Sequence, residues 1–185
     1  VQTCALPIWL DHLIENFLAY VRLEMAAADS TKSAEFHGQS TPNAAASITE
    51  KAQTIARQEK RGGDLTLELA TVVLPLAEAH LSKLTEELVS NAFKFSKPGS
   101  PVKVTLSADD RGATLIVDDH GRGLTPEQIN RIGAYMQFDR KSHEQQGAGL
   151  GLIIAKRITE IHGGTLSLTS DAHGTTATVH LPKAH

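Results

Sequence analysis

The stretch from Glu87 to Phe95 puts an acid, an amide and a cation at helical spacing. Glu87, Asn91 and Lys94 recur at i, i+4 and i+7, so their side chains share one helix face. A carboxylate, an amide oxygen and an ammonium together can hold a metal-bound phosphate. Taken alone, the same residues also fit a solvated, salt-bridged face. A second face of this helix is apolar and is expected to form one buried stripe: Leu81, Leu84, Leu88 and Phe95.

The second motif is a glycine-rich turn directly after a predicted strand. It spans 118–123 and consists of Asp-Asp-His-Gly-Arg-Gly. Gly121 and Gly123 would let the backbone approach a planar ligand closely. Asp119 could accept a hydrogen bond from an exocyclic amine such as that of adenine. A simple turn is the alternative for this motif without its context.

The third motif spans 147–152, Gly-Ala-Gly-Leu-Gly-Leu, immediately before a predicted helix. Glycines at this position expose backbone amides at a helix N-terminus, where the helix dipole and free N–H groups favour phosphate. The motif lacks the Lys-Ser/Thr ending of a P-loop. It follows a loop and not a strand, which argues against a dinucleotide-binding fingerprint.

Hydrophobic periodicity predicts an α+β fold, a two-layer α/β sandwich. Its sheet would be mixed and mostly antiparallel, with helices on one face and an amphipathic helix in front. The helices are predicted over Leu10–Met25, Ile48–Arg61, Pro75–Ser96, a short segment from Thr125, and Gly151–His162. The strands are predicted over Asp64–Ala70, Val102–Leu106, Ala113–Val117, Leu166–Leu168 and Ala177–Leu181. The polar segment Met136–Gln146 has no clear period and is expected to be a mobile loop.

Composition excludes several classes of protein. The chain has 185 residues, 41% of them hydrophobic, and a formal net charge of −3. Mild acidity argues against nucleic acid as a partner and against contact of this fragment with an anionic membrane. The single cysteine, Cys4, excludes a disulfide framework and a cysteine metal cluster, so we expect a cytoplasmic location. No apolar run is long enough for a membrane span, although the parent protein could be membrane-anchored.

Taken in order, the three motifs resemble the ATP-binding catalytic domain of sensor histidine kinases. These kinases are a branch of the Bergerat-type ATPase superfamily that also contains DNA gyrase B, the Hsp90 chaperone and MutL. The resemblance covers roughly Asn43–Leu181. Phe138 and Arg140, within Met-Gln-Phe-Asp-Arg, are similar to the lid motif of the kinase branch and set the chain apart from gyrase and MutL.

The resemblance implies Mg²⁺ and ATP as ligands and a role for each matching residue. Asn91 would be the magnesium ligand, and Glu87 the acid that polarises the attacking group or a water. Lys94 would contact phosphate, Asp119 would recognise the adenine amine, and Thr175 would support adenine binding. The remaining implied ATP-binding residues are Gly121, Gly123, Phe138, Arg140, Gly147, Gly149, Leu150 and Gly151.

The N-terminal helix adds to the resemblance. Residues 17–24, Phe-Leu-Ala-Tyr-Val-Arg-Leu-Glu, are similar to the end of the second helix of the kinase dimerisation bundle. We therefore expect residues 9–25 to be a remnant of that bundle, 26–47 a linker and 48–185 the catalytic domain. Residues 1–8 resemble translated sequencing adapter and are expected to be non-native, with a genuine irregular tail as the alternative. In the full-length protein the bundle would form a homodimer.

The family's phosphoacceptor histidine would lie upstream of Leu10 and is absent from this sequence. His37 has the spacing to Thr-Pro of an acceptor motif, but it lacks the neighbouring acid and lies in the linker, so we reject it. His12 lies on the bundle-like helix without the motif. His120 replaces an asparagine that often follows the acid, which should be tolerated. The fragment should therefore bind nucleotide without phosphorylating itself.

Three functions are compatible with these motifs. The main one is transfer of the ATP γ-phosphate to a histidine, for relay to an aspartate in the receiver domain of a response regulator. Within the same superfamily, the rivals are a serine kinase of the anti-sigma type and an ATPase-driven clamp. A non-catalytic, ATP-binding regulatory module is the rival from another class.

Overall fold

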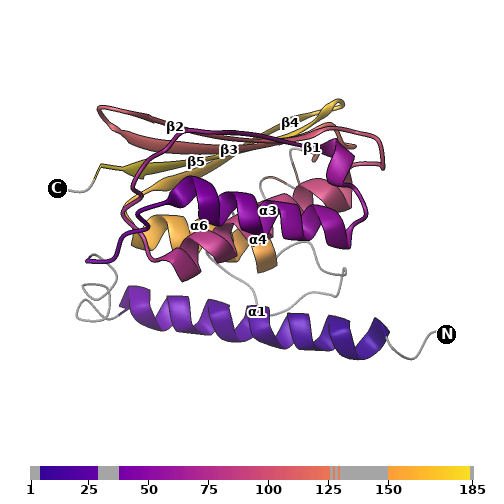
Figure 1. Cartoon of the computed structure of the whole chain (residues 1–185). Coiled ribbons are helices and arrows are strands. Elements are labelled where there is room, and N and C mark those ends of the chain that lie inside the picture. The colour runs from indigo at the N-terminus through magenta and orange to yellow at the C-terminus, as the bar shows by residue number, and fades with distance from the viewer. Residues whose placement is uncertain (1–4, 29–37, 126, 128, 130–149, 184–185) are drawn as a thin grey trace.

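The structure is a computed structural model that describes residues 5–28, 38–125, 127, 129 and 150–183, with the backbone alone for 5–12 and 28. Three layers are visible in Figure 1. A sheet forms one side, three helices cover one of its faces, and a long N-terminal helix lies beneath those helices. The predicted α+β class, with a mixed sheet and helices on one face, is confirmed.

The sheet has five strands in the order β1-β2-β3-β5-β4. The strand bounds are β1 Leu65–Leu69, β2 Val102–Asp109, β3 Gly112–Asp119, β4 Thr165–Asp171 and β5 Gly174–Pro182. β1 pairs with β2 in parallel and every other pairing is antiparallel. The side chains alternate in exposure along β2 and β3, because successive residues of a strand point to opposite faces. The inward-facing residues of β3 are Ala113, Leu115, Val117 and, at its end, Asp119.

The helical layer consists of α3 (Ala44–Gln58), α4 (Glu78–Phe95) and α6 (Leu150–Ile161). α4 packs between the other two helices and against the sheet. Its buried stripe includes Leu81, Leu84 and Leu88, as the sequence predicted. Phe95 was wrongly included in that stripe: it is only half-buried, and Phe93 fills the core in its place.

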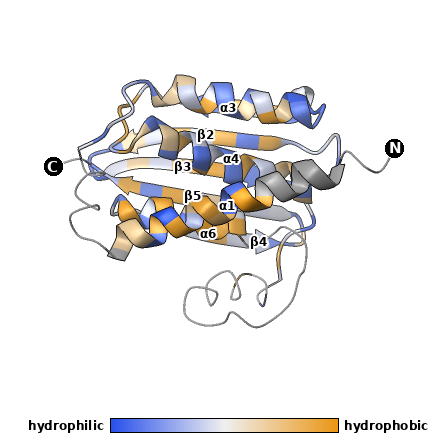
Figure 2. Cartoon of the chain, turned by 90° about the horizontal axis from the view of Figure 1, so that it is seen from below, coloured by the Kyte–Doolittle hydropathy of each residue, from blue (hydrophilic) through white to orange (hydrophobic). Residues whose placement is uncertain are grey.

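The N-terminal helix α1 (Ala5–Ala28) packs on α6. It begins five residues earlier and ends three residues later than predicted. Its contacts include buried Leu23 and Ala26 and an ion pair between Glu24 and Arg157. Figure 2 looks onto this helix and shows hydrophobic residues along both α1 and α6. No helix in the described part of the chain is both long and apolar enough to cross a membrane.

The sequence predicts an apolar stripe on this helix, and most of it is not the face that docks on α6. The stripe consists of Leu10, Leu13, Ile14, Phe17, Leu18 and Val21. Leu13, Ile14, Phe17 and Leu18 remain 42–57% exposed, and Val21 is half-buried. Burying such side chains is favourable, so a continuous apolar stripe left in water marks a surface for association. This stripe is therefore available to another helix.

Arg61 ties the end of α3 to the end of α4. Its side chain is buried, and its guanidinium donates to the carbonyls of Phe93, Ser96, Lys97 and Ser100 at 2.7–3.0 Å. It also pairs with Asp64 at 2.6 Å. The last carbonyls of a helix have no intrahelical partner, so Arg61 supplies the hydrogen bonds that end α4.

Replacing Arg61 should destabilise the fold more than replacing an exposed arginine. Arg61→Ala leaves buried carbonyls and Asp64 without their partner, and we expect the free energy of unfolding to fall by about 3–5 kcal/mol. Arg111→Ala is the control, because the Arg111 side chain is 86% exposed and pairs with Asp109 at the surface. Its effect should stay within about 0.5 kcal/mol. Denaturant unfolding measures both, and equal values for the two variants would contradict the role of Arg61.

Candidate functional site

Glu87 and Asn91 meet the start of α6. A Cβ atom built on Gly151 would overlap Oε2 of Glu87 and lie 3.6 Å from Nδ2 of Asn91. Only glycine at this position lets the first turn of α6 lie directly against the two polar side chains. The first and third sequence motifs, separated by about sixty residues, are therefore in contact in the fold. Leu150, the first residue of α6, lies beside them and is half-buried.

Two buried polar atoms in this region have no hydrogen-bond partner among the described residues: Oε1 of Glu87 and Nδ2 of Asn91. Buried polar groups are nearly always satisfied, so an unsatisfied pair points to a polar ligand. Oε1 of Glu87 lies 2.7 Å from the ammonium of Lys83, as an ion pair whose angles do not make a hydrogen bond. An acid and an amide beside a helix N-terminus suit a cation and the phosphate oxygens it bridges.

Lys94 does not join this cluster directly. Its side chain is exposed, and its ammonium lies 5.7 Å from the centre of the Phe95 ring. The guanidinium of Arg122 lies 5.2 Å from the same ring centre. The two cations therefore flank one half-buried aromatic ring at the C-terminal end of α4. They add positive charge to this end of the helix, which favours an anionic ligand.

The α4 face that carries Glu87 and Asn91 forms one wall of the candidate site. The other wall is a row of polar side chains at one end of the sheet. Asp119 pairs with Thr175, and Thr175 with Ser170, in the register of β3, β5 and β4. All three continue the inward-facing, otherwise apolar positions of their strands. The hydroxyls of Ser170 and Thr175 are 2.9 Å apart. Period-two alternation thus places a carboxylate and two hydroxyls toward the helices.

The turn after β3 is fixed against these residues. The backbone amide of Gly121 donates to Oδ1 of Asp119 at 2.9 Å. Gly123 has a φ of 69° and packs so closely on Asp171 that a Cβ atom would overlap its carbonyl. The amide of Leu124 donates to Oγ of Ser170 at 2.7 Å. The turn is therefore attached to the β4–β5 hairpin.

The same turn also contacts the end of α4. The amide of Arg122 donates to the carbonyl of Phe95 at 3.3 Å. This contact brings the second motif next to the first, so the α4 face and the polar row of the sheet border one region. Four predicted site residues lie outside the described residues: Phe138, Arg140, Gly147 and Gly149.

Burial sets the electrostatics of Asp119. Removal from water raises the pKa of its carboxyl above the usual 3.8, although the amides of Gly121 and Thr175 oppose that shift. Asp119 is 7% exposed and lies on the face of the sheet that the helices cover. A buried acid held by backbone amides is suited to accept a hydrogen bond from a ligand amine.

Three residues at the site were not identified from the sequence: Ser170, Lys83 and Arg122. The alternation of Leu166 and Leu168 continues to position 170, which could have placed Ser170 on the inward face. Lys83 precedes Glu87 by four residues, the spacing of a helical ion pair. Arg122 lies within the second motif, yet its contact with Phe95 arises only from the fold.

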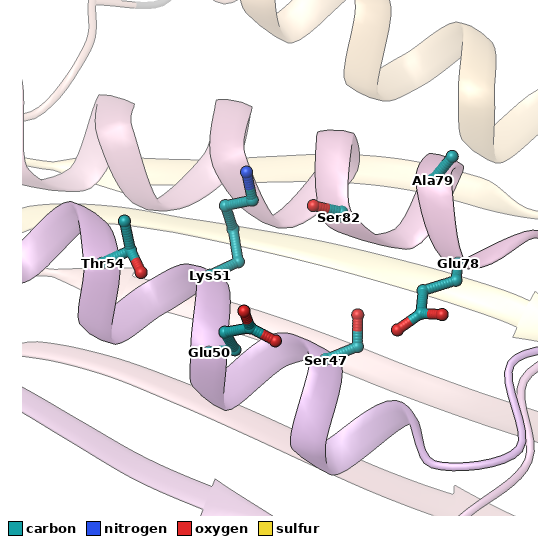
Figure 3. A pocket seen from close by; sticks show the side chains of 7 residues that line it. All are labelled: Ser47, Glu50, Lys51, Thr54, Glu78, Ala79 and Ser82. Atoms are coloured by element: carbon teal, nitrogen blue, oxygen red, sulfur yellow. The ribbon is translucent and has the colours of Figure 1, made fainter.

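A hollow among the described side chains lies away from these residues. It measures about 380 Å³, lies between α3 and α4, and is shown in Figure 3. Its lining contains none of the predicted site residues: Ser47, Glu50, Lys51, Thr54, Glu78, Ala79 and Ser82. The described residues also contain no group of three or more His, Cys, Asp or Glu side chains that could hold a metal ion.

Comparison with known families identifies the domain. A family model described as histidine kinase-, DNA gyrase B-, and HSP90-like ATPase matches residues 76–185, more than half of the chain. The chain belongs to this family. The match runs from just before α4 to the C-terminus and includes Glu87, Asn91, Asp119 and Thr175. The resemblance inferred from the motifs is confirmed.

Curated relatives in this ATPase family are sensor proteins. The heme sensor protein HssS of Staphylococcus saprophyticus is 36% identical over 117 residues, 63% of this chain and 25% of that protein. The sensor protein SrrB of Staphylococcus aureus is 32% identical over 111 residues, 56% of this chain and 18% of that protein. The chain spans a quarter or less of the length of these relatives.

Solved structures of the family agree with the fold. The mycobacterial sensor histidine kinase MprB matches with a TM-score of 0.63 and 25% identity, over 78% of this chain and 97% of that chain. The Acinetobacter baumannii histidine kinase AdeS matches with a TM-score of 0.71 over 95% of this chain and 79% of that chain. Its identity is 16%, so it supports the fold alone.

The buried carboxylate of Asp119 should cost stability. Its pKa is raised in the folded protein, so folding favours the protonated form, and stability is lost as pH rises from the unfolded pKa through the folded one. Asp119→Asn should therefore raise the melting temperature at pH 7, and the gain should shrink toward pH 4. Asp110→Asn, in the exposed β2–β3 turn, is the control. A melting temperature that is unchanged or lower in Asp119→Asn at pH 7 would contradict this account.

Proposed function

We propose that this chain is the ATP-binding catalytic domain of a two-component sensor histidine kinase. It would transfer the γ-phosphate of ATP to a histidine on a helical bundle, for relay to an aspartate of a response regulator. The observation that supports this most directly is the contact of Glu87 and Asn91 with Gly151, which joins two unsatisfied buried atoms to a helix N-terminus. The sensor proteins among its relatives support the same function.

Each wall of the site has a proposed task. The adenine would lie against the polar row, where Asp119 accepts a hydrogen bond from the exocyclic amine and Thr175 supports it. The triphosphate would lie between α4 and the start of α6, with Lys94 as a counter-charge. Asn91 would hold Mg²⁺, which when bound neutralises and orients the phosphate oxygens. Glu87 would polarise the attacking group.

Phosphoryl transfer requires little covalent chemistry from the protein, so these residues would act by position and charge. The acceptor would be an imidazole nitrogen of a histidine supplied by a bundle helix. The apolar stripe of α1 that remains exposed, Leu13 to Leu18, supports association with such a helix and a homodimer in the full-length protein. The receiver domain of a response regulator would then take the phosphate.

A transfer experiment tests the function against its rivals. The chain is mixed with radiolabelled ATP and a helical-bundle peptide that carries an acceptor histidine. Label on that histidine, stable to base and released by acid, is the expected result. Tight binding of ATP without label would favour a non-catalytic module. Label on serine of an anti-sigma-factor antagonist would favour the serine kinase.

Replacing Asn91 should abolish the effect of magnesium on nucleotide binding. Asn91→Ala removes the amide oxygen proposed to bind the cation, so the affinity for ATP should fall about tenfold or more and become the same with Mg²⁺ or with EDTA. Calorimetric titration measures both affinities. Ser82→Ala, on the α3-facing side of α4, is the control and should keep the magnesium effect. A magnesium effect that persists in Asn91→Ala refutes the assigned role.

Replacing Asp119 should remove selectivity for adenine. Asp119→Ala deletes the acceptor for the exocyclic amine, so ATP affinity should fall about tenfold. Affinity for GTP, which presents a carbonyl at the same ring position, should change little. Competition of both nucleotides against a fluorescent ATP analogue gives the ratio. An equal loss for both nucleotides would show that Asp119 supports the pocket without recognising the base.

A further inference from the structure

Lys83 connects the N-terminal helix to the nucleotide site. Its ammonium donates to Oδ1 of Asn16 on α1 at 2.8 Å and to Oε1 of Glu86 at 2.9 Å. It also lies 2.7 Å from Oε1 of Glu87. An ammonium has three donors, and here two of them are hydrogen-bonded to Asn16 and Glu86, while Glu87 is held by the ion pair alone. A single charged group thus contacts both α1 and the acid of the site.

Lys83 and Glu87 are both largely shielded from solvent, which strengthens the interaction between their charges. The Lys83 side chain is 22% exposed and that of Glu87 only 9%, so solvent screens this pair weakly. Burial lowers the pKa of Lys83, but the carboxylates of Glu87 and Glu86 outweigh this and raise it, so the ammonium stays charged. Lys51 of α3 also binds Glu86, at 3.2 Å, and completes a row of alternating charges.

We propose that Lys83 is a positioning residue for Glu87 and that it couples the docking of α1 to nucleotide binding. This inference rests on the proposed function, because it assumes that Glu87 borders the triphosphate. Lys83 neutralises a carboxylate that would otherwise repel the phosphates. Asn16 draws one donor of the same ammonium toward α1. Docked α1 therefore weakens the neutralisation of Glu87.

The coupling has a direction. Without Asn16, all three donors of Lys83 are available to the carboxylates of Glu86 and Glu87. The charge facing the triphosphate becomes less negative, and Mg-ATP binds more tightly. By thermodynamic reciprocity, bound Mg-ATP must loosen the docking of α1 by the same factor. The N-terminal helix is thus a restraint on the site, released in part by the nucleotide.

Loss of the Asn16 contact should not detach the helix. α1 is also held by the ion pair of Glu24 with Arg157 and by the burial of Leu23 and Ala26, about two turns further along. Substitutions at Asn16 and Lys83 therefore remove one contact between α1 and α4 and leave the α1–α6 interface in place. This separation makes the coupling measurable in the whole chain.

The test is a double-mutant cycle in the 185-residue chain. Asn16→Ala, Lys83→Met and the double variant are titrated with Mg-ATP by calorimetry. Amide hydrogen exchange of α1 is followed with and without Mg-ATP in the same proteins. Lys51→Met is the matched control, because Lys51 binds Glu86 but makes no hydrogen bond or ion pair with Glu87 or with the described side chains of α1. Circular dichroism checks that each variant is folded.

We expect Asn16→Ala to tighten Mg-ATP binding by about fivefold when Lys83 is present and to have no effect in Lys83→Met. Mg-ATP should accelerate exchange in α1 in the wild type and in Lys51→Met, but not in Lys83→Met. An Asn16→Ala effect that is absent, or equal in both backgrounds, would overturn the coupling and leave the proposed function standing. A wild-type chain that gives no heat with Mg-ATP would overturn the proposed function, and this inference with it.

Discussion

The close approach of α6 to α4 at Gly151 is the constraint on which the site depends. α4 packs its apolar stripe on the sheet, and this leaves Glu87 and Asn91 to face its neighbour. A side chain at position 151 would displace the Glu87 carboxylate, so the start of α6 can meet the acid and amide only without one. The polar side chains of α4 and the backbone amides at the start of α6 thereby form one candidate binding surface.

The polar row of the sheet, on the other side of the candidate site, follows from the alternation of side chains along each strand. Inward-facing positions of β3, β5 and β4 are apolar except at one end of the sheet, where the end of β3, the start of β5 and the end of β4 carry Asp119, Thr175 and Ser170. The core therefore ends in a polar row at one end of the sheet. Backbone amides hold the Asp119 carboxylate in this row, although its burial is unfavourable and raises its pKa. Such a buried acid is suited to recognise a ligand amine.

Charge connects the site to the remainder of the chain. Lys51, Glu86, Lys83 and Glu87 alternate in sign from α3 across α4, and Asn16 of α1 joins the same row. Exposed ion pairs contribute little to stability, but these are partly buried, and two of the three share the ammonium of Lys83. A change at Asn16 of α1 would therefore alter the hydrogen bonds of the Lys83 ammonium, which pairs with Glu87. The exposed apolar stripe of α1 gives that helix a second surface through which a partner could act.

The sequence by itself determined the fold class and predicted the helices, the strands and the candidate site residues, because helical and strand periodicity and the glycine motifs are local properties. It could not place Phe95, whose spacing matched the apolar stripe although the end of α4 turns it toward Arg122. Nor could it distinguish which face of α1 docks, since both faces carry apolar residues. The meeting of Glu87 with Gly151 was decided only by the tertiary structure, because contacts between distant segments depend on how whole helices pack and leave no local periodicity.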